Sequence, residues 1–241
     1  MRADSISPAF AEVETIDGRR LRVEITINPR ARRISVRIDP VRRLAVATAP
    51  SARQLKRTHA FVVERAGWIA KELSALPQGL AFLPHAMAPF RGALHELIYE
   101  QGRGAGRCEA GRLIIPAPGL DLFEARAARF FKGAALADLK ARVAVHAAAL
   151  GVEPRRIQVK DTRSRWGSCS TEGALSFSWR VICAPPFVLD YLAAHEVAHL
   201  REMNHSRRFW ALVKRLCPED ERGKAWLDRH GAALHGIGVR P

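Results

Sequence analysis

Apolar and polar residues alternate along three stretches near the amino terminus of the chain. The apolar positions lie two residues apart, as in strands with one buried face, over Leu21–Ile27, Ile34–Ile38 and Leu44–Thr48. Asn28-Pro29 and Asp39-Pro40 supply turn signals between these stretches. The pattern therefore predicts three strands in a meander, preceded by an irregular lead-in over residues 1–15.

The middle of the chain changes from helical to extended spacing and back again. Apolar positions three and four residues apart predict a helix over about 51–76, with Ser51 as its cap, and another over 122–150. Between them, the alternation over 93–100 and 112–116 predicts two strands. The glycines of QGRGAGRCEAG connect these strands. Because they lack the lysine and the strand–turn–helix context of a phosphate loop, they indicate a hairpin loop.

The last third of the chain carries two further strands and three helices. Strands are predicted over 157–160 and 174–181, and an almost wholly apolar helix begins at Pro185-Pro186. Ser206 can cap a following helix, and a last helix opens at Pro218. We find no internal repeat in the sequence.

The pattern as a whole predicts an α+β fold in two parts. Residues 1–119 form a basic, β-rich amino-terminal region with one helix at about 51–76, and the boundary lies in the proline-rich segment 116–119. Residues 120–241 form a mainly helical region that carries a small sheet and the apolar helix. With 241 residues, the chain can bury one large core or two modest ones.

The apolar helix contains the string His195-Glu196-Val197-Ala198-His199. Positions four apart share a helix face, so His195 and His199 present their imidazoles to the same point. Glu196 lies one residue further round the helix and can reach a water on a bound ion without ligating the ion. His205 is the expected third ligand once the helix has ended. These are the parts of a Zn²⁺ hydrolase in which Glu196 is the general base. The mainly helical region 120–241 is therefore predicted to be a zincin-like metallopeptidase domain.

Two further observations bear on this string. Imidazoles and a carboxylate on an otherwise apolar helix are costly unless they are paired or metallated, which favours a metal site over a chance string. The spacing from His195 to His205 equals that of the metzincin pattern, but Glu202 stands where that pattern has its glycine. Asn204 is the better candidate for the turn, because asparagine tolerates the left-handed conformation. The chain is therefore not predicted to be a metzincin, and its ion could be catalytic or structural.

Composition favours a globular protein in a reducing compartment. The hydrophobic fraction is 48% and the charged fraction 26%, as in ordinary globular domains. The first 15 residues lack the apolar segment of a secretion signal, and no apolar run is long enough to cross a membrane. The cysteines form no C-x-x-C pair and are interpreted as small buried thiols: Cys108, Cys169, Cys183 and Cys217. We therefore expect a cytoplasmic location and no membrane partner.

The chain has a formal net charge of +15 and a pI near 10.9. Arginines dominate the polar positions of the amino-terminal strands, among them Arg33, Arg37 and Arg43. Such a surface can bind nucleic acid or another polyanion by releasing counterions. A diffuse basic surface without a specific partner explains the charge equally well, so charge alone does not decide between them.

Four blocks in the second half of the chain resemble the YgjP-like metal-dependent hydrolases. They are RWGSCS (165–170), LSFSWRVICAPP (175–186), VLDYLAAHEVAHL (188–200) and NHSRRFW (204–210). The resemblance is strongest over about residues 155–215, and it implies a metallopeptidase related to the SprT and Spartan-type zinc proteases. It further implies His195, His199 and His205 as zinc ligands, Glu196 as general base, and residues 165–170 with the following strand as the wall beside the site. Ser178 departs from the family pattern, which often has asparagine before the tryptophan.

The favoured function is hydrolysis of peptide bonds in a peptide or protein substrate. Tyr191, Arg163, Arg165 and Arg180 are the candidates for stabilising the oxyanion. One alternative is a nucleic-acid-associated binding protein with a structural or vestigial zinc site, or a protease that acts on nucleic-acid-bound proteins. Another is a zinc hydrolase of a non-peptide amide, because the same metal, water and carboxylate would serve it.

Overall fold

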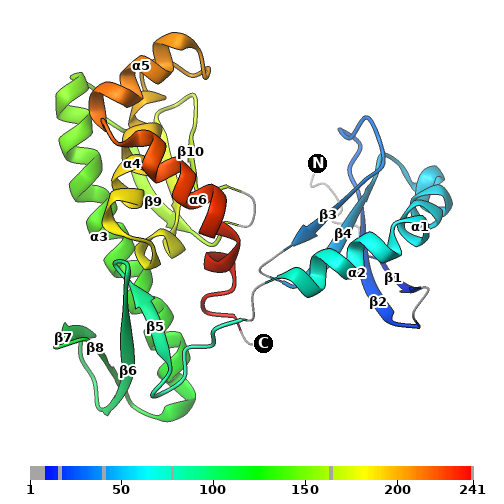
Figure 1. The fold of residues 1–241 in the computed structure, drawn as a ribbon, viewed down its shortest axis with the longest axis horizontal. Coiled ribbons are helices and arrows are strands. Elements are labelled where there is room, and N and C mark those ends of the chain that lie inside the picture. Colours follow the sequence, from blue (N-terminus) through cyan, green and yellow to red (C-terminus); the bar gives the residue numbers. More distant parts are fainter. Residues whose placement is uncertain (1–8, 16–17, 40–41, 77–78, 163–164, 240–241) are drawn as a thin grey trace, which may run out of the picture. The chain divides into compact units, whose positions relative to one another are not determined.

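The computed structural model describes residues 9–15, 18–39, 42–76, 79–162 and 165–239. The chain forms two compact units, Met1–Pro77 and Gln78–Pro241, called here the first and the second unit (Figure 1). Both combine helices with small sheets, so the predicted α+β fold class is confirmed. The units divide at residues 77–78, whereas the proline-rich segment 116–119 lies inside the second unit.

A four-stranded sheet forms the basis of the first unit. Its strands are β1 (Ala9–Glu14), β2 (Arg20–Ile27), β3 (Ser35–Asp39) and β4 (Leu44–Ala49). They lie in the order β1-β2-β4-β3, with β2 and β4 parallel and both outer pairs antiparallel. The predicted meander is therefore wrong, because β4 lies between β2 and β3. The predicted lead-in is also wrong, since it contributes strand β1.

Two helices pack on this sheet. After the 3-10 turn η1 (Ala52–Gln54) come α1 (Leu55–Glu64) and α2 (Ala66–Ala75). The single helix predicted for 51–76 is thus interrupted at Arg65, and Ser51 makes no side-chain cap hydrogen bond. The alternating apolar side chains of the strands and the apolar faces of both helices form a core of their own. Its fully buried members are Val23, Ala45, Ala47, Val62 and Ile69.

The second unit opens with a sheet of the same topology. Its strands are β5 (Met87–Phe90), β6 (Ala93–Gln101), β7 (Arg107–Glu109) and β8 (Arg112–Ala117). Their order is β5-β6-β8-β7, again with a parallel central pair and antiparallel outer pairs. Each sheet leads through an extended residue, Ser51 or Gly119, into a 3-10 turn and a helix; the second turn is η2 (Leu120–Leu122). The chain therefore repeats one architecture, although its sequence shows no evident repeat.

A long helix joins this sheet to the rest of the second unit. Helix α3 (Phe123–Leu150) contacts β8 and also the small third sheet and helix α4 (Pro186–Ala198), as Figure 1 shows. Gly151 ends it with φ of 61°, a left-handed conformation that glycine adopts without strain. The third sheet consists of β9 (Arg156–Lys160), β10 (Gly167–Cys169) and β11 (Ala174–Ser178). Its order is β10-β11-β9, so β11 is internal and β10 is an edge strand.

Three helices complete the second unit. The 3-10 turn η3 (Trp179–Cys183) leads into α4, which is followed by α5 (Arg207–Leu216) and α6 (Asp220–His235). Helix α4 is packed between α3 and α6, which explains why its sequence is apolar on nearly every side. One continuous core extends from Phe82 and Phe90, near the second sheet, to Phe209 in α5. The helix that carries the histidine string lies within this core.

No helix in the described part of the chain is long and apolar enough to span a membrane. All four cysteines are free thiols. Cys183 and Cys217 are buried, Cys169 is partly exposed and Cys108 is exposed. The expectation of four buried thiols is therefore correct for only two of them.

Candidate metal centre

Helix α4 carries His195 in its last turn and is fixed to its neighbour α3. Asp190, in the middle of α4, accepts hydrogen bonds from Arg142 and His146 of α3, each at 2.6 Å. Burial opposes the charge on Asp190, but these two hydrogen bonds outweigh it and lower the pKa of the carboxyl group. His146 is therefore a packing residue and does not belong to the histidine cluster. The helix that positions the first ligand candidates is held by charge-assisted hydrogen bonds as well as by its apolar faces.

After α4 the chain turns and returns His205 to the end of the helix. Three backbone hydrogen bonds close this turn onto carbonyls in the last turn of α4. No described residue in the segment 199–206 has a positive φ, so the left-handed turn predicted at Asn204 is wrong. Ser206 caps α5 as predicted, because its hydroxyl accepts a hydrogen bond from the N–H of Phe209 at 3.3 Å.

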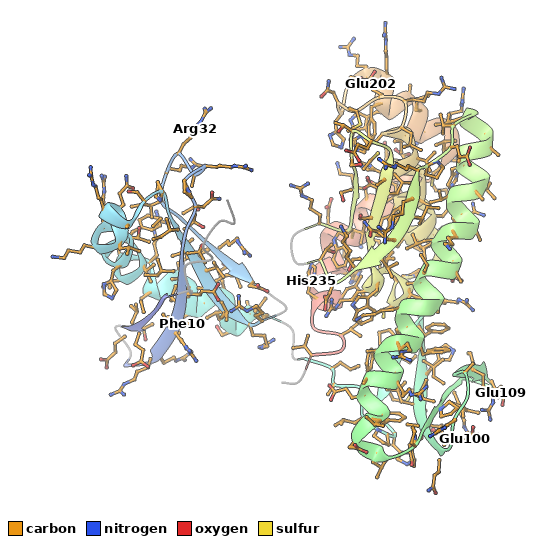
Figure 2. All side chains as sticks on the ribbon, turned by 180° about the vertical axis from the view of Figure 1, so that it is seen from behind. Phe10, Arg32, Glu100, Glu109, Glu202 and His235 are labelled. Carbon is orange, nitrogen blue, oxygen red and sulfur yellow. The ribbon has the colours of Figure 1, made fainter. Side chains whose placement is uncertain are left out.

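Arg201 anchors the same turn to the end of α3. Its Nη2 atom donates to the carbonyl oxygens of Leu150, at 2.9 Å, and Gly151, at 3.1 Å. These carbonyls have no partner within their own helix, and a cation is favourable at a helix carboxyl end. Arg201 thus fixes the segment between the second and the third histidine without approaching the cluster itself. Glu202, labelled in Figure 2, marks this end of the second unit.

His195, His199 and His205 point toward one place. One possible ligand atom from each lies within 4.8 Å of the other two, and the Nε2 atoms of His195 and His205 are 3.2 Å apart. Nδ1 of His199 donates to the carbonyl oxygen of Glu202 at 3.1 Å, which leaves its Nε2 free to bind a metal. Two ligand atoms of a tetrahedral zinc, with bonds of about 2.0–2.1 Å, are separated by about 3.3 Å. The donor set and the observed spacing therefore fit such an ion.

The protonation states also suit metal binding. The pKa of His195 is lowered to about 4, mainly by burial and in addition by the positive charges of His199, His205 and Lys224. Burial likewise lowers the pKa of His199. Both shifts favour the neutral imidazole, which is the form that ligates a metal.

An aromatic side chain that was not selected from the sequence packs against all three imidazoles. Phe209 of α5 is fully buried, and its ring centroid lies 4.9 Å from that of His195, 4.4 Å from His199 and 4.7 Å from His205. Trp210 packs at 5.8 Å from both His195 and His205. The sequence does contain a signal for Phe209, because it lies three residues after the helix cap Ser206. That position in the first turn of α5 faces back toward the third histidine.

Glu196 lies beside the histidines against the edge strand β10. Its side chain is buried, and burial raises its pKa to about 8 against the opposing influence of Arg165. A Cβ atom on Gly167 would lie 2.3 Å from its Oε1 atom, so only glycine leaves space for the carboxylate there. The close approach of the Glu196 side chain therefore explains why the RWGSCS block has a glycine at position 167. A bound divalent cation would favour the charged carboxylate and lower this pKa.

A cavity of about 330 Å³ opens beside His195 and Glu196. Its lining comes from β10, α4, α5 and α6 and includes Trp166, Tyr191, Trp210, Lys224 and Asp228. Lys224 and Asp228 lie one turn apart on α6 and were not selected from the sequence. No spacing pattern connects them with the histidine string, because α6 reaches the cavity only through its packing on α4.

The remaining candidates from the sequence have different surroundings. Arg180 is fully buried, donates to the carbonyl oxygen of Ile237 at 2.9 Å and pairs with Asp161, so it supports the fold away from the cavity. Arg163 lies outside the described residues. His235 of α6 stacks on Trp166 at 4.3 Å and is not one of the three histidines that converge.

The sequence model of the YgjP-like metallopeptidase domain matches residues 32–230 of the chain. The chain belongs to the YgjP-like family. This YgjP-like chain is therefore a metal-dependent peptidase, and its family implies a divalent metal. The match begins within the first unit and ends in α6, so it includes all three histidines, the whole second sheet and strands β3 and β4 of the first sheet.

Comparison with solved structures finds partial similarity to the crystal structure of the metallopeptidase zymogen of Pyrococcus abyssi abylysin. That similarity has a TM-score of 0.35 at 23% sequence identity and covers 40% of this chain and 94% of the other. No curated protein sequence matches the YgjP-like chain.

Proposed function

We propose that this metallopeptidase is a zinc enzyme in which His195, His199 and His205 hold the ion and Glu196 is the general base. The observation that carries the proposal is the convergence of three imidazoles and one buried carboxylate at a single cavity. One carboxylate oxygen, Oε2, is buried and has no hydrogen-bond partner among the described residues. A polar atom buried in this way is costly unless a ligand or water completes it.

When bound, a zinc ion supplies Lewis acidity toward the peptide carbonyl and activates a water for attack. Glu196 accepts the proton of that water and then donates it to the departing amine. Tyr191 and Lys224 carry hydrogen-bond donors and line the same cavity. They are therefore our candidates for stabilising the negative charge that develops on the carbonyl oxygen. They replace Arg180, whose guanidinium is already engaged elsewhere.

The substrate backbone pairs with the edge strand β10 in this proposal. Strand β11 has neighbours on both sides, whereas β10 is paired on one side only and contributes Gly167 to the cavity. An added strand gains main-chain hydrogen bonds irrespective of its sequence. This arrangement favours a peptide over a small non-peptide amide, because only an extended backbone can form such a ladder.

The experiment compares wild type with Glu196→Gln, measuring zinc content by elemental analysis and cleavage of an unfolded protein. Glu196→Gln should keep its zinc and lose cleavage by roughly 10²–10⁴-fold, since it removes the base but no ligand. Glu172→Gln makes the same chemical change on an exposed side chain in the turn between β10 and β11 and should behave as wild type. Equal cleavage by zinc-loaded Glu196→Gln and wild type would refute the role of Glu196 as general base. A wild-type protein without zinc would refute the proposed zinc site.

A further inference from the structure

A basic groove lies in the first unit, between the loop that joins β2 to β3 and helix α1. It has a volume of about 570 Å³ and is lined by Arg32, Arg33, Ile34, Gln54, Arg57, Ala60, Phe61 and Glu64. Arg32 is labelled in Figure 2, where it extends from the loop between β2 and β3. Arginines from two separate elements thus face one concave surface.

The two walls of this groove are held by local hydrogen bonds. In the loop, the side chain of Asn28 accepts from the N–H of Arg30 at 3.0 Å, and its carbonyl accepts from the N–H of Ala31 at 2.9 Å. At the start of α1, the hydroxyl of Thr58 donates to the carbonyl of Gln54 at 2.9 Å. The backbone that carries the arginines is therefore preorganised, which lowers the entropic cost of binding a ligand.

The arginines of the groove have no partners of their own. Arg32, Arg33 and Arg57 are exposed, and within the part of the chain that the structure describes none of them has an ion pair or a hydrogen-bonded side chain. By contrast, Arg42 of the same unit pairs with Glu24. Glu64 is the one acidic residue in the lining, so the groove keeps a surplus of positive charge.

The first unit as a whole also favours an anionic ligand. Residues 1–77 contain 15 lysines and arginines against 8 aspartates and glutamates. Phe61 adds an aromatic ring to the lining, with the guanidinium of Arg65 at 5.4 Å from its centroid. A basic groove combined with an aromatic ring is typical of surfaces that bind single-stranded nucleic acid, where arginines contact phosphates and bases stack on rings. A duplex is read by a convex element that enters its groove, and the surface here is concave.

We propose that this groove binds single-stranded nucleic acid, with Arg32, Arg33 and Arg57 contacting successive phosphates and Phe61 stacking on a base. The site belongs to the first unit and does not depend on the zinc centre. Of the arginines selected from the sequence, only Arg33 belongs to it. Arg37 lies along strand β3, and Arg43 lies in the turn directly before β4.

The test measures binding of a fluorescent oligothymidylate of about 16 nucleotides to the full-length chain at several salt concentrations. Replacing Arg32, Arg33 and Arg57 together by glutamine should weaken binding about tenfold or more at low salt. It should also reduce the slope of log K against log salt by about 2, because each lost phosphate contact contributes about 0.7. The matched control replaces Arg20, Arg53 and Lys71 by glutamine, which removes the same charge from the same unit outside the groove lining.

Two further measurements separate this groove from a diffuse basic surface. Phe61→Leu should weaken oligothymidylate binding by about fivefold or more, but leave binding of heparin, which has no bases to stack, unchanged. Circular dichroism and resistance of residues 1–77 to limited proteolysis establish that the first unit of each variant is folded. The proposal fails if the wild type does not bind the oligonucleotide at low salt, or if the control triple variant loses as much affinity as the groove variant. It also fails if a duplex of the same length binds as tightly as the single strand.

Discussion

The two four-stranded sheets share one strand order but contribute differently to the protein. The first, β1-β2-β4-β3, packs on α1 and α2 and has a small core that none of the metal-centre residues enters. The second, β5-β6-β8-β7, packs on α3, and its apolar residues belong to the same core as the metal helix α4. The comparison shows that topology does not determine function here. What differs is the element that covers each sheet.

The arginines near the two sheets differ in the same way. In the second sheet, Arg107 pairs with Glu100 and Glu109, which are labelled in Figure 2. The equivalent groove there, between residues 104–106 and α3, is about 400 Å³. Its arginines, Arg126 and Arg129, both come from α3, and its loop has glycines where the first unit has arginines. A Cβ on Gly106 would lie 2.7 Å from a ring carbon of Phe130. The loop therefore lies too close to α3 to carry a side chain at this position, and only the groove of the first unit has arginines on both of its walls.

The largest loss of stability is expected from a substitution in the core that the second sheet shares with helix α4. Phe131 of α3 is fully buried and stacks on Phe82 at 4.6 Å, with Phe90 and Trp179 at its edges. Phe131→Ala should lower the free energy of unfolding by about 3–5 kcal/mol, because it leaves a large cavity. Thermal unfolding followed together with zinc content should show both falling in parallel. Retention of zinc through the unfolding of this core would contradict the link between sheet and metal centre.

A substitution in the core of the first unit should cause a smaller loss of stability, and this loss should not affect the second unit. Ile69 of α2 is fully buried in the core of that unit. Ile69→Ala should destabilise this unit by about 2–5 kcal/mol, while zinc content and cleavage of a short peptide stay as in wild type. Limited proteolysis would show cleavage appearing within residues 1–77. If the variant lost zinc as well, the two cores would be coupled and the contrast between the sheets would be wrong.

The smallest effect concerns the hydrogen bonds from α3 to α4. The pKa of Asp190 is lowered in the folded protein, so its charge stabilises the fold above its unfolded pKa of about 3.9. That contribution is lost as pH falls through the lower, folded pKa. Asp190→Asn should therefore be less stable than wild type at pH 7, and the difference should shrink toward pH 3. Chemical denaturation at both pH values measures the difference in free energy of unfolding between the variant and wild type. A difference that grew on acidification would contradict the lowered pKa of Asp190.

Sequence patterns were informative where a local spacing carries the information. Residues two apart marked the faces of β2, β3 and β4, and residues four apart placed His195 and His199 on one side of a helix. The cap at Ser206 was predicted correctly because its hydrogen bond reaches only three residues along the chain. The lead-in that became β1 was missed, since Ala9–Glu14 is ordered only by pairing with β2.

Spacing alone does not indicate which elements meet. The meander was wrong because alternation determines which side of a strand is buried but not which strand lies beside it. The repeated architecture was missed for a related reason: the two sheets share pairings between strands and little sequence. The expected boundary at 116–119 marked the end of the second sheet, whereas the division between cores lies at 77–78.

The sequence by itself selected the histidine string, the apolar helix that carries it and the excess of positive charge. These depend on residue identity and on spacings within one or two helical turns. Only the tertiary structure placed Phe209 against all three imidazoles, made β10 the open edge beside Glu196 and brought Lys224 of α6 to the cavity. It also placed Arg32, Arg33 and Arg57 around one groove, without ion-pair partners among the described residues. Each of these arrangements depends on packing between segments far apart in the chain, which no local pattern records.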